Sequence, residues 1–313
     1  MSFLSFVRRD TRRRGRGPNG PAAVRALAAI GLSAVMIGTT MPAGQAAEKD
    51  TLILGAMGDV AALERAVGHP LAVHKYGQLS GSVPSNAKMI NMEPGSTPWR
   101  QVASAKPGSS LHSNIVRWAD TLKSRKERIL FAFDHEPEAS GSDRMGSASD
   151  YIAAYRRVVD IFRSRGVNNL EYTWQMTANA FRVKSGDDRA AAKWYPGNSY
   201  VDHVGADPYN WYKCGQGQGN WVHLQTLVDP VIAFARARNK QVVLAEWASD
   251  ADSRRADWLR RAGDYFQSNS DVLRAVFYFQ NSHRAGCEWQ LRSNADVSAF
   301  RSFASDRSTF RVE

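Results

Sequence analysis

Eight short apolar runs, rich in β-branched and aromatic residues, recur along the chain, and segments with helical periodicity separate most of them. Runs of this kind predict buried strands, and apolar residues spaced three and four apart predict amphipathic helices. The predicted strands are residues 52–56, 71–76, 87–93, 129–133, 170–176, 201–207, 241–246 and 273–279. Strands that alternate with helices form parallel sheets, so eight such units in about 265 residues predict a (β/α)8 barrel, the TIM barrel.

An open, doubly wound sheet is the alternative architecture. The glycine-rich phosphate-binding motifs that follow the first strand of many such sheets are absent after residues 52–56. Helices are expected over about residues 59–67, 113–125, 150–165, 221–238, 253–266 and 297–304. No repeat, linker or low-complexity segment follows the N-terminal region, so residues 47–313 are predicted to form a single domain.

The N-terminal region has a different composition. Residues 1–25 carry seven arginines and one acid, residues 26–40 are apolar, and small residues follow at 43–47. This order predicts a secretory signal peptide over residues 1–46, cleaved near Ala46 or Ala47, and hence a secreted, extracellular protein. An uncleaved membrane anchor is the alternative, but the apolar run is short for a membrane span.

Cleavage would remove much of the positive charge. The chain has 41 basic and 30 acidic residues, and the predicted leader holds 7 of the basic and 1 of the acidic residues. The remaining net charge of +5 is interspersed, so a nucleic-acid partner loses its main support. No stretch after the leader is apolar enough to span a membrane, and stable membrane insertion is not expected.

The chain has two cysteines, Cys214 and Cys287. An even number in a secreted chain favours one disulfide, with two free thiols as the alternative. Neither cysteine has the spacing of a metal site. No motif in the sequence indicates a catalytic metal or a cofactor, and a structural calcium and the oligomeric state stay open.

Glu136 lies just after the predicted strand at residues 129–133, and Glu246 ends the predicted strand at residues 241–246. A carboxylate at the tip of a buried strand is costly unless it is paired or used. In a barrel, both would point into one cleft at the carboxyl ends of the strands. Glycoside hydrolysis uses such a pair of carboxyl groups. The alternative is that each glutamate caps a loop or pairs with an arginine.

Sequence motifs around these glutamates resemble glycoside hydrolase family 26. They are Asp-His-Glu after the fourth predicted strand, Trp-Tyr-Pro-Gly-x-x-Tyr-Val-Asp-x-x-Gly-x-Asp-x-Tyr-Asn over residues 194–210, and the glutamate that ends the seventh strand. The resemblance covers about residues 85–285. It implies a (β/α)8 barrel whose acid/base and nucleophile lie on strands four and seven, in a family of β-mannanases with some β-1,3-1,4-glucanases and β-1,3-xylanases.

By this resemblance Glu136 is the acid/base, Glu246 the nucleophile, and Tyr209 a hydrogen-bond donor to the nucleophile. The resemblance also implies that His135, Asp202 and Asp207 contact the sugar or orient the site, although Asp202 could equally serve an Asx turn. Aromatic residues at or near strand ends are candidates for stacking on sugar rings, with core or rim packing as the alternative: Trp174, Trp211, Trp247 and Phe279.

The sequence departs from the family where the sugar is chosen. Pro137-Glu138-Ala139-Ser140 replaces the aromatic or Met, Asn-Gly and tryptophan that commonly follow the acid/base, and Phe279 stands where a tryptophan is usual. The resemblance favours a retaining, endo-β-1,4-mannanase-like hydrolase of β-linked polysaccharide, and these departures concern the sugar rather than the reaction. The alternatives are a retaining hydrolase of β-1,3-1,4-glucan, β-1,3-xylan or an exported bacterial polysaccharide, and a non-catalytic glycan-binding barrel.

Overall fold

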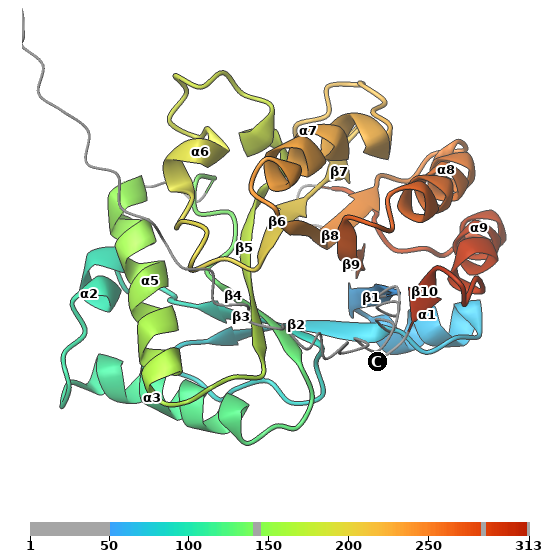
Figure 1. Cartoon of the computed structure of the whole chain (residues 1–313). Coiled ribbons are helices and arrows are strands. Elements are labelled where there is room, and N and C mark those ends of the chain that lie inside the picture. The colour runs from blue at the N-terminus through green and yellow to red at the C-terminus, as the bar shows by residue number, and fades with distance from the viewer. Residues whose placement is uncertain (1–50, 140–144, 283–285, 312–313) are drawn as a thin grey trace, which may run out of the picture. The chain divides into compact units, whose positions relative to one another are not determined.

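The computed structural model describes residues 51–139, 145–282 and 286–311, so the predictions for residues 1–46 lie outside the described residues. Eight parallel strands form a barrel, and β9 pairs with both β8 and β1, which closes it (Figure 1). The strands are β1 (Leu52–Gly58), β2 (Ala72–Gln78), β3 (Met89–Glu93), β4 (Ile129–Phe133), β5 (Leu170–Thr177), β6 (His203–Asp207), β8 (Gln241–Ser249) and β9 (Leu273–Gln280). The predicted (β/α)8 barrel is confirmed.

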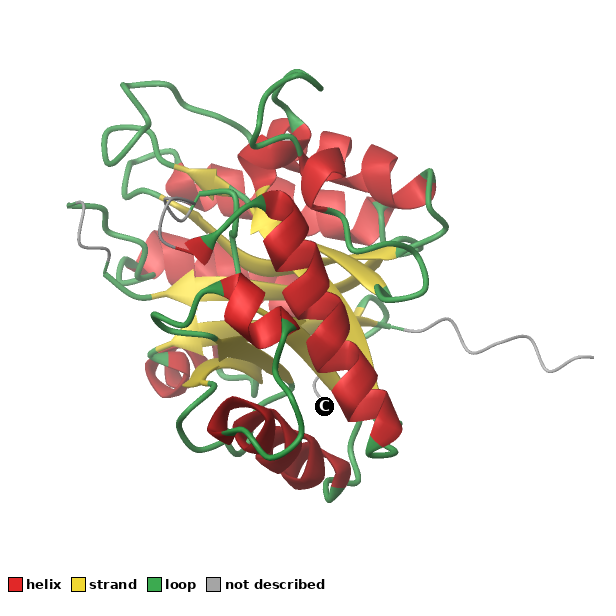
Figure 2. Ribbon diagram, turned by 90° about the vertical axis from the view of Figure 1, so that its left-hand side faces the viewer, coloured by secondary structure: helices red, strands yellow, loops and turns green. Residues whose placement is uncertain are grey.

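Helices surround the strands (Figure 2). They are α1 (Val60–Val67), α2 (Trp99–Ala103), α3 (Ser110–Lys123), α5 (Ala148–Ser164), the 3-10 helix η1 (Ala178–Phe181), α6 (Ala191–Trp194), α7 (Leu224–Arg236), α8 (Arg255–Ser268) and α9 (Asn294–Ala304). Two further strands were not predicted, β7 (Tyr209–Asn210) beside β8 and β10 (Phe310–Arg311) beside β1. Strands of two residues are too short to carry a periodic pattern.

The helix starts follow local hydrogen bonds. The Asp59 side chain accepts from the Ala62 N–H and caps α1, as predicted. Helix α5 begins earlier than predicted, because Ser147 and Asp150 form a capping box in which each side chain accepts from the other residue's backbone.

Apolar side chains form two separate layers. A large cluster lies between the strands and the helices, and a smaller one fills the barrel interior. Alternation along each strand divides the residues between them; in β8, Val243 and Ala245 belong to the interior cluster, while Val242 and Leu244 belong to the outer one. The interior members are Ile53, Ala72, Met89, Leu130, Ala132, Val243, Ala245, Ala275 and Phe277.

A belt of polar side chains crosses the barrel interior. His74 contacts the Ala245 carbonyl at 3.0 Å and Asn91 Oδ1 at 3.1 Å, and Asn91 Nδ2 donates to Gln175 Oε1 at 2.7 Å. Gln175 Nε2 donates to both carboxylate oxygens of Asp207, at 2.9 and 2.7 Å. These hydrogen bonds link β2, β3, β5, β6 and β8. Because each buried polar group has a partner, the belt fixes the strand ends without the cost of unpaired polar atoms.

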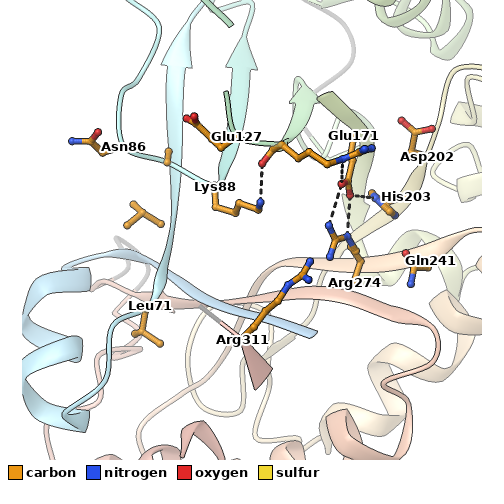
Figure 3. Close-up of a pocket in the computed structure, with 13 residues that line it drawn as sticks. Leu71, Asn86, Lys88, Glu127, Glu171, Asp202, His203, Gln241, Arg274 and Arg311 are labelled. Carbon is orange, nitrogen blue, oxygen red and sulfur yellow. Dashed lines mark hydrogen bonds and ion pairs between the residues drawn. The ribbon is translucent and has the colours of Figure 1, made fainter. Parts of the chain in front are cut away.

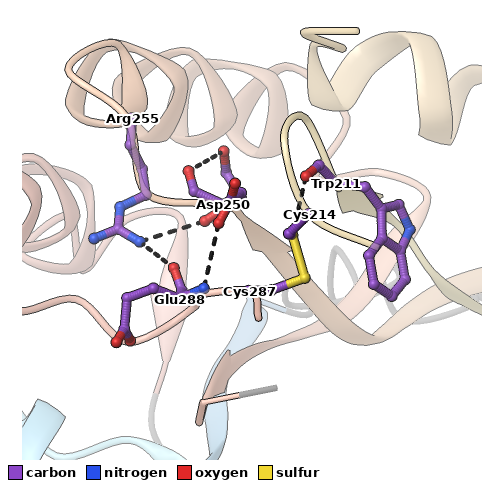
Figure 4. Close-up of a disulfide and its surroundings, with 7 residues drawn as sticks. Trp211, Cys214, Asp250, Arg255, Cys287 and Glu288 are labelled. Atoms are coloured by element: carbon purple, nitrogen blue, oxygen red, sulfur yellow. Dashed lines mark hydrogen bonds between the residues drawn. A yellow bond between two sulfur atoms is a disulfide. The ribbon is translucent and has the colours of Figure 1, made fainter. Parts of the chain in front are cut away.

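The predicted disulfide is present between Cys214 and Cys287, with 5.1 Å between the two Cα atoms (Figure 4). Cys214 lies in the loop after β7 and Cys287 after β9, so the bond joins two loops at the carboxyl ends of the strands.

Replacing both cysteines with alanine is expected to lower the free energy of unfolding by up to about 4 kcal/mol, because the bond closes a loop of 73 residues in the unfolded chain. Urea unfolding of the oxidised protein and the double variant measures the difference. An unchanged unfolding midpoint would show that the bond adds no stability.

Among the described residues, no helix is both long and apolar enough to cross a membrane.

Candidate active site

The two glutamates line one cavity of about 300 Å3 at the carboxyl ends of the strands. We call it the small cavity. Its lining is Met57, Tyr76, His135, Glu136, Tyr209, Trp211, Glu246 and Phe279. Six residues that the sequence singled out lie together here: His135, Glu136, Tyr209, Trp211, Glu246 and Phe279. The charge of Glu246 raises the pKa of Glu136.

Glu136 projects from a strained turn after β4. The backbone φ angles of Asp134 and Glu136 are 51° and 46°, in the left-handed region that side chains other than glycine rarely adopt. The Glu136 N–H donates to the Gln175 carbonyl of β5 at 3.2 Å, and Pro137 follows. Such conformations persist where the surrounding structure over-determines them, and they gather at functional sites.

Glu246 reaches the cavity through an irregularity in β8. The pairing of β8 with β9 shifts register between Leu244 and Trp247. Strict alternation would turn residue 246 outward after the interior residue Ala245. The irregularity instead lets Glu246 face the small cavity, and Trp247 joins the outer cluster.

Two tyrosines hold the Glu246 carboxylate. Tyr76 donates to Oε1 and Tyr209 donates to Oε2. Burial and the Glu246 charge raise the pKa of both tyrosines, so both stay protonated and able to donate. Tyr209 has the hydrogen bond that the family resemblance implied. Tyr76 was missed by the sequence analysis, although its place at the end of a predicted strand was a usable signal.

Tyr76→Phe is expected to lower kcat/KM roughly 10- to 100-fold, because it removes one charge-assisted hydrogen bond from a buried carboxylate. Initial rates on the best substrate measure the loss. Tyr195→Phe is the matched control, since the Tyr195 hydroxyl bonds Asn198 outside the cavity. Equal rates for Tyr76→Phe and the control would remove Tyr76 from the site's machinery.

His135 lines the small cavity and also lies beside a second pair of carboxyl groups, those of Glu93 and Asp134. Its Nδ1 is 3.0 Å from Glu93 Oε1. Burial opposes a charge on His135, but Glu93, Glu246 and Glu136 together raise its pKa well above the ordinary value. Asp134 accepts from Trp99 Nε1 at 2.6 Å, and burial and Glu93 raise its pKa to about 8. The raised pKa values favour a protonated His135 and a protonated Asp134, which lowers the negative charge of this group. Hydrogen bonds from His135 and Trp99 stabilise the remaining charge.

The pKa of Glu136 is raised to about 7, by burial first and then by the charge of Glu246. Burial and both glutamates also raise the pKa of Asp207 well above its ordinary value. Asp207 lies beneath the pair, where it accepts from Gln175 and from the Glu246 N–H. A carboxyl protonated near neutrality beside an ionised one is the arrangement that acid-assisted nucleophilic chemistry needs.

A second cavity of about 680 Å3 adjoins the first. Glu136, Tyr209 and Trp211 line both cavities, whereas Glu246 lines only the small one. We call the second one the large cavity. Its other lining residues are Glu138, Ala139, Thr177, Ala178, Asn179, Arg182, Arg189, Asp207, Gln216, Gly217, Asn220, Val222 and Leu227. Glu136 therefore stands at the boundary between two binding spaces.

Two predicted sugar-stacking residues are structural, and these predictions are wrong. Trp174 is fully buried and contacts Phe181, Tyr195 and Phe234 outside the barrel. Trp247 is fully buried among aromatic rings of α8, α9 and β9. Both belong to the layer between strands and helices, where no ligand can reach them. Trp211 and Phe279 line the small cavity, and their contact with sugar rings stays a prediction.

Asp202 lies at the opposite end of the barrel, so its predicted sugar contact is wrong. It precedes β6, and its carboxylate accepts from the Tyr172 N–H at 2.8 Å. It lines a cavity of about 1000 Å3 at the amino ends of the strands (Figure 3). There Glu171 binds Arg274, His203 and Arg128. Buried ionic groups at this end of a barrel are typical of a stabilising role.

A closed (β/α)8 barrel with two coupled carboxyl groups at its strand ends, one of them bound by two tyrosines, defines a glycoside hydrolase. Residues 107–277, more than half of the chain, match the model of glycosyl hydrolase family 26. The chain belongs to this family.

Individual relatives are distant. Endoglucanase H of Acetivibrio thermocellus is 27% identical over 211 residues, which are 64% of this chain and 23% of that protein. The catalytic domain of an endo-β-1,4-mannanase from Bacillus sp. JAMB-750 superposes with a TM-score of 0.59 at 15% identity, over 84% of this chain and 87% of that one. A β-mannanase from Bacteroides ovatus superposes with a TM-score of 0.55 at 15% identity, over 85% of this chain and 91% of that one. These superpositions support the fold.

Proposed function

We propose that this chain is a retaining hydrolase of β-linked polysaccharide, most similar in activity to an endo-β-1,4-mannanase. In this proposal Glu246 is the nucleophile and Glu136 the acid/base. One observation carries it: Glu136 lines both cavities, whereas Glu246 lines only the small one and has a tyrosine on each carboxylate oxygen. A bond held between the two cavities would have Glu136 beside its bridging oxygen and Glu246 beside the anomeric carbon.

The reaction takes two displacements. Glu246 attacks the anomeric carbon of the sugar in the small cavity, while Glu136 gives its proton to the glycosidic oxygen and the leaving chain departs through the large cavity. Glycosylation removes the charge of Glu246, so Glu136, now ionised, can take a proton from water as the water attacks. The ester hydrolyses with net retention, and both carboxyl groups return to their first states.

The tyrosines stabilise different stages of this cycle. In the resting enzyme, Tyr76 and Tyr209 share the charge of Glu246. After attack, one Glu246 oxygen carries the sugar, and the tyrosine on the other oxygen continues to orient the ester.

A panel of polysaccharides with reducing-end detection tests the proposal. Mannanases and an endoglucanase are among the similar proteins, and β-1,4-mannan is expected to be cleaved first. Release from β-1,3-1,4-glucan, β-1,3-xylan or a bacterial exopolysaccharide in its place would change the substrate and keep the chemistry. Binding to a polysaccharide without release of reducing ends from any member of the panel would favour a glycan-binding barrel.

The rate should depend on pH as a bell. Glu136 must be protonated for the first step, and its pKa is raised to about 7, so kcat/KM should fall above about pH 7. A carboxyl group must be ionised to attack the anomeric carbon, so the rate should also fall on the acid side. Initial rates from pH 4 to 9 on a verified substrate give the profile. A flat profile would contradict both roles.

We propose further that the enzyme is exported and that residues 1–46 are removed near Ala46 or Ala47. The arginine-rich start, the apolar run and the small residues support this, and the disulfide suits an oxidising compartment. N-terminal sequencing of protein recovered from the medium tests it.

A further inference from the structure

We propose that the large cavity recognises a sugar carrying a carboxylate, with Arg182 as the specificity-determining residue. The preferred substrate is then an acidic β-linked polysaccharide whose charged unit lies on the leaving-group side of the cleaved bond. This inference rests on the proposed function, because the proposed roles of Glu136 and Glu246 make the large cavity the leaving-group side.

The positive charge of the large cavity comes from the segment that follows β5. Arg182 and Arg189 both line the cavity, and both are exposed. Among residues 51–139, 145–282 and 286–311, no lysine or arginine lines the small cavity, and His135 is its basic residue. The two sides of the cleft therefore differ in chemistry: the small one suits a neutral sugar between aromatic rings and carboxyl groups, and the large one offers guanidinium groups.

The two arginines differ in how far they are already engaged. The Arg189 Nε and Nη2 atoms donate to Asp187 at 3.0 and 2.8 Å. The Arg182 guanidinium has no hydrogen bond, ion pair or aromatic partner among residues 51–139, 145–282 and 286–311. An unpaired guanidinium presents a fork of N–H donors that matches the two oxygens of a carboxylate. Arg182 is thus the residue that an anionic sugar would meet.

Acids in the same cavity do not occupy Arg182. Glu138 is 8% exposed, and its Oε1 accepts from the backbone N–H and the hydroxyl of Thr177, at 2.8 and 2.6 Å. Burial raises the pKa of Glu138 to about 7, and Glu136 has a similar pKa, so neither is a full negative charge near neutral pH. Asn179, Gln216 and Asn220 also line the cavity and supply amides for sugar hydroxyls.

The test uses one polymer in two forms. A β-1,4-mannan is oxidised at a fraction of its C6 positions to carboxylate, and half of that sample is then reduced so that the same positions are alcohols again. We expect kcat/KM of the wild type to be roughly tenfold higher on the oxidised form, and the preference to fall with added salt. Arg182→Gln should lose the preference, so that its kcat/KM values on the two forms become equal.

Lys184→Gln is the matched control, since Lys184 is an exposed cation of the same segment outside the cavity lining. It should keep the preference. Calorimetric binding of oligosaccharides from both polymer forms to the inactive Glu246→Ala enzyme gives a second readout that needs no cleavage. No preference in the wild type, or one that survives Arg182→Gln in rates and in binding, overturns the inference. Failure to cleave either form, with the binding preference intact, contradicts the mannanase activity and leaves the acidic subsite standing.

Discussion

Glu246→Ala is expected to lower activity on every substrate by roughly 10^5-fold, which is the scale of loss when a catalytic nucleophile is removed. The variant keeps the barrel and both cavities but has no carboxylate to form the covalent intermediate. Measured rates on the polymer and on an aryl glycoside should fall together. Glu127→Ala is the matched control, because Glu127 is exposed and lines the cavity at the opposite end of the barrel. It should keep full activity.

Glu136→Ala separates the two roles. It should lower the rate of polymer hydrolysis roughly 10^2- to 10^4-fold, which is the usual contribution of general acid catalysis. An aryl glycoside with an acidic phenol needs no proton, so glycosylation of Glu246 should persist and azide, which needs no base, should rescue turnover. The product should be the β-glycosyl azide, with retained configuration.

The azide product also identifies a reversal. With Glu246→Ala, azide must attack from the opposite face and give the α-glycosyl azide. The β-azide from Glu246→Ala together with the α-azide from Glu136→Ala would show that the roles are exchanged. Full activity of either variant would exclude that residue from the mechanism.

Arg255→Met is expected to lower the free energy of unfolding by about 3–5 kcal/mol, because it leaves the buried Asp296 carboxylate without its cation. The Arg255 and Asp296 side chains are 4% and 6% exposed, and Nη2 is 2.7 Å from Asp296 Oδ2. Arg255 also donates to the Glu288 carbonyl at 2.7 Å (Figure 4). It donates to the Gln290 carbonyl at 3.1 Å as well. It therefore joins α8, α9 and the segment that holds Cys287.

Urea unfolding of Arg255→Met and of Arg261→Met measures this effect. Arg261 lies on the same helix in an exposed ion pair with Asp257, and its loss should leave the unfolding midpoint almost unchanged. A similar midpoint for both variants would mean that the buried network adds nothing to stability.

The fold was predictable because the strands are buried on both faces. Apolar runs such as residues 129–133 and 241–246 stand out in sequence, and their alternation with helices permits few topologies. The catalytic glutamates were predictable for a related reason, since a carboxylate at the end of an apolar run is conspicuous. The two-residue strands β7 and β10 carry no such pattern and were missed.

The surroundings of the glutamates were harder to predict. Glu246 and Trp247 are neighbours in sequence, yet Glu246 faces the cavity and Trp247 faces the helices. Only the register shift in β8 explains this arrangement. Tyr76 and Glu246 are 170 residues apart, so their hydrogen bond exists only once the barrel closes. The large cavity draws its lining from residues spread between 136 and 227, and no local pattern marks them as neighbours.

The left-handed backbone conformation at Glu136 lowers the stability of the fold at a position where the proposed activity requires a carboxyl side chain. A side chain there costs roughly 1 kcal/mol of conformational free energy that glycine would not incur. The raised pKa of Glu136 adds to this, because burying a carboxyl that would otherwise ionise at neutral pH disfavours the folded state. Glu136→Gly should therefore unfold at a higher temperature than the wild type, although it lacks the proposed acid/base. Selection for thermostability alone would therefore favour replacement of Glu136, the residue proposed as the acid/base.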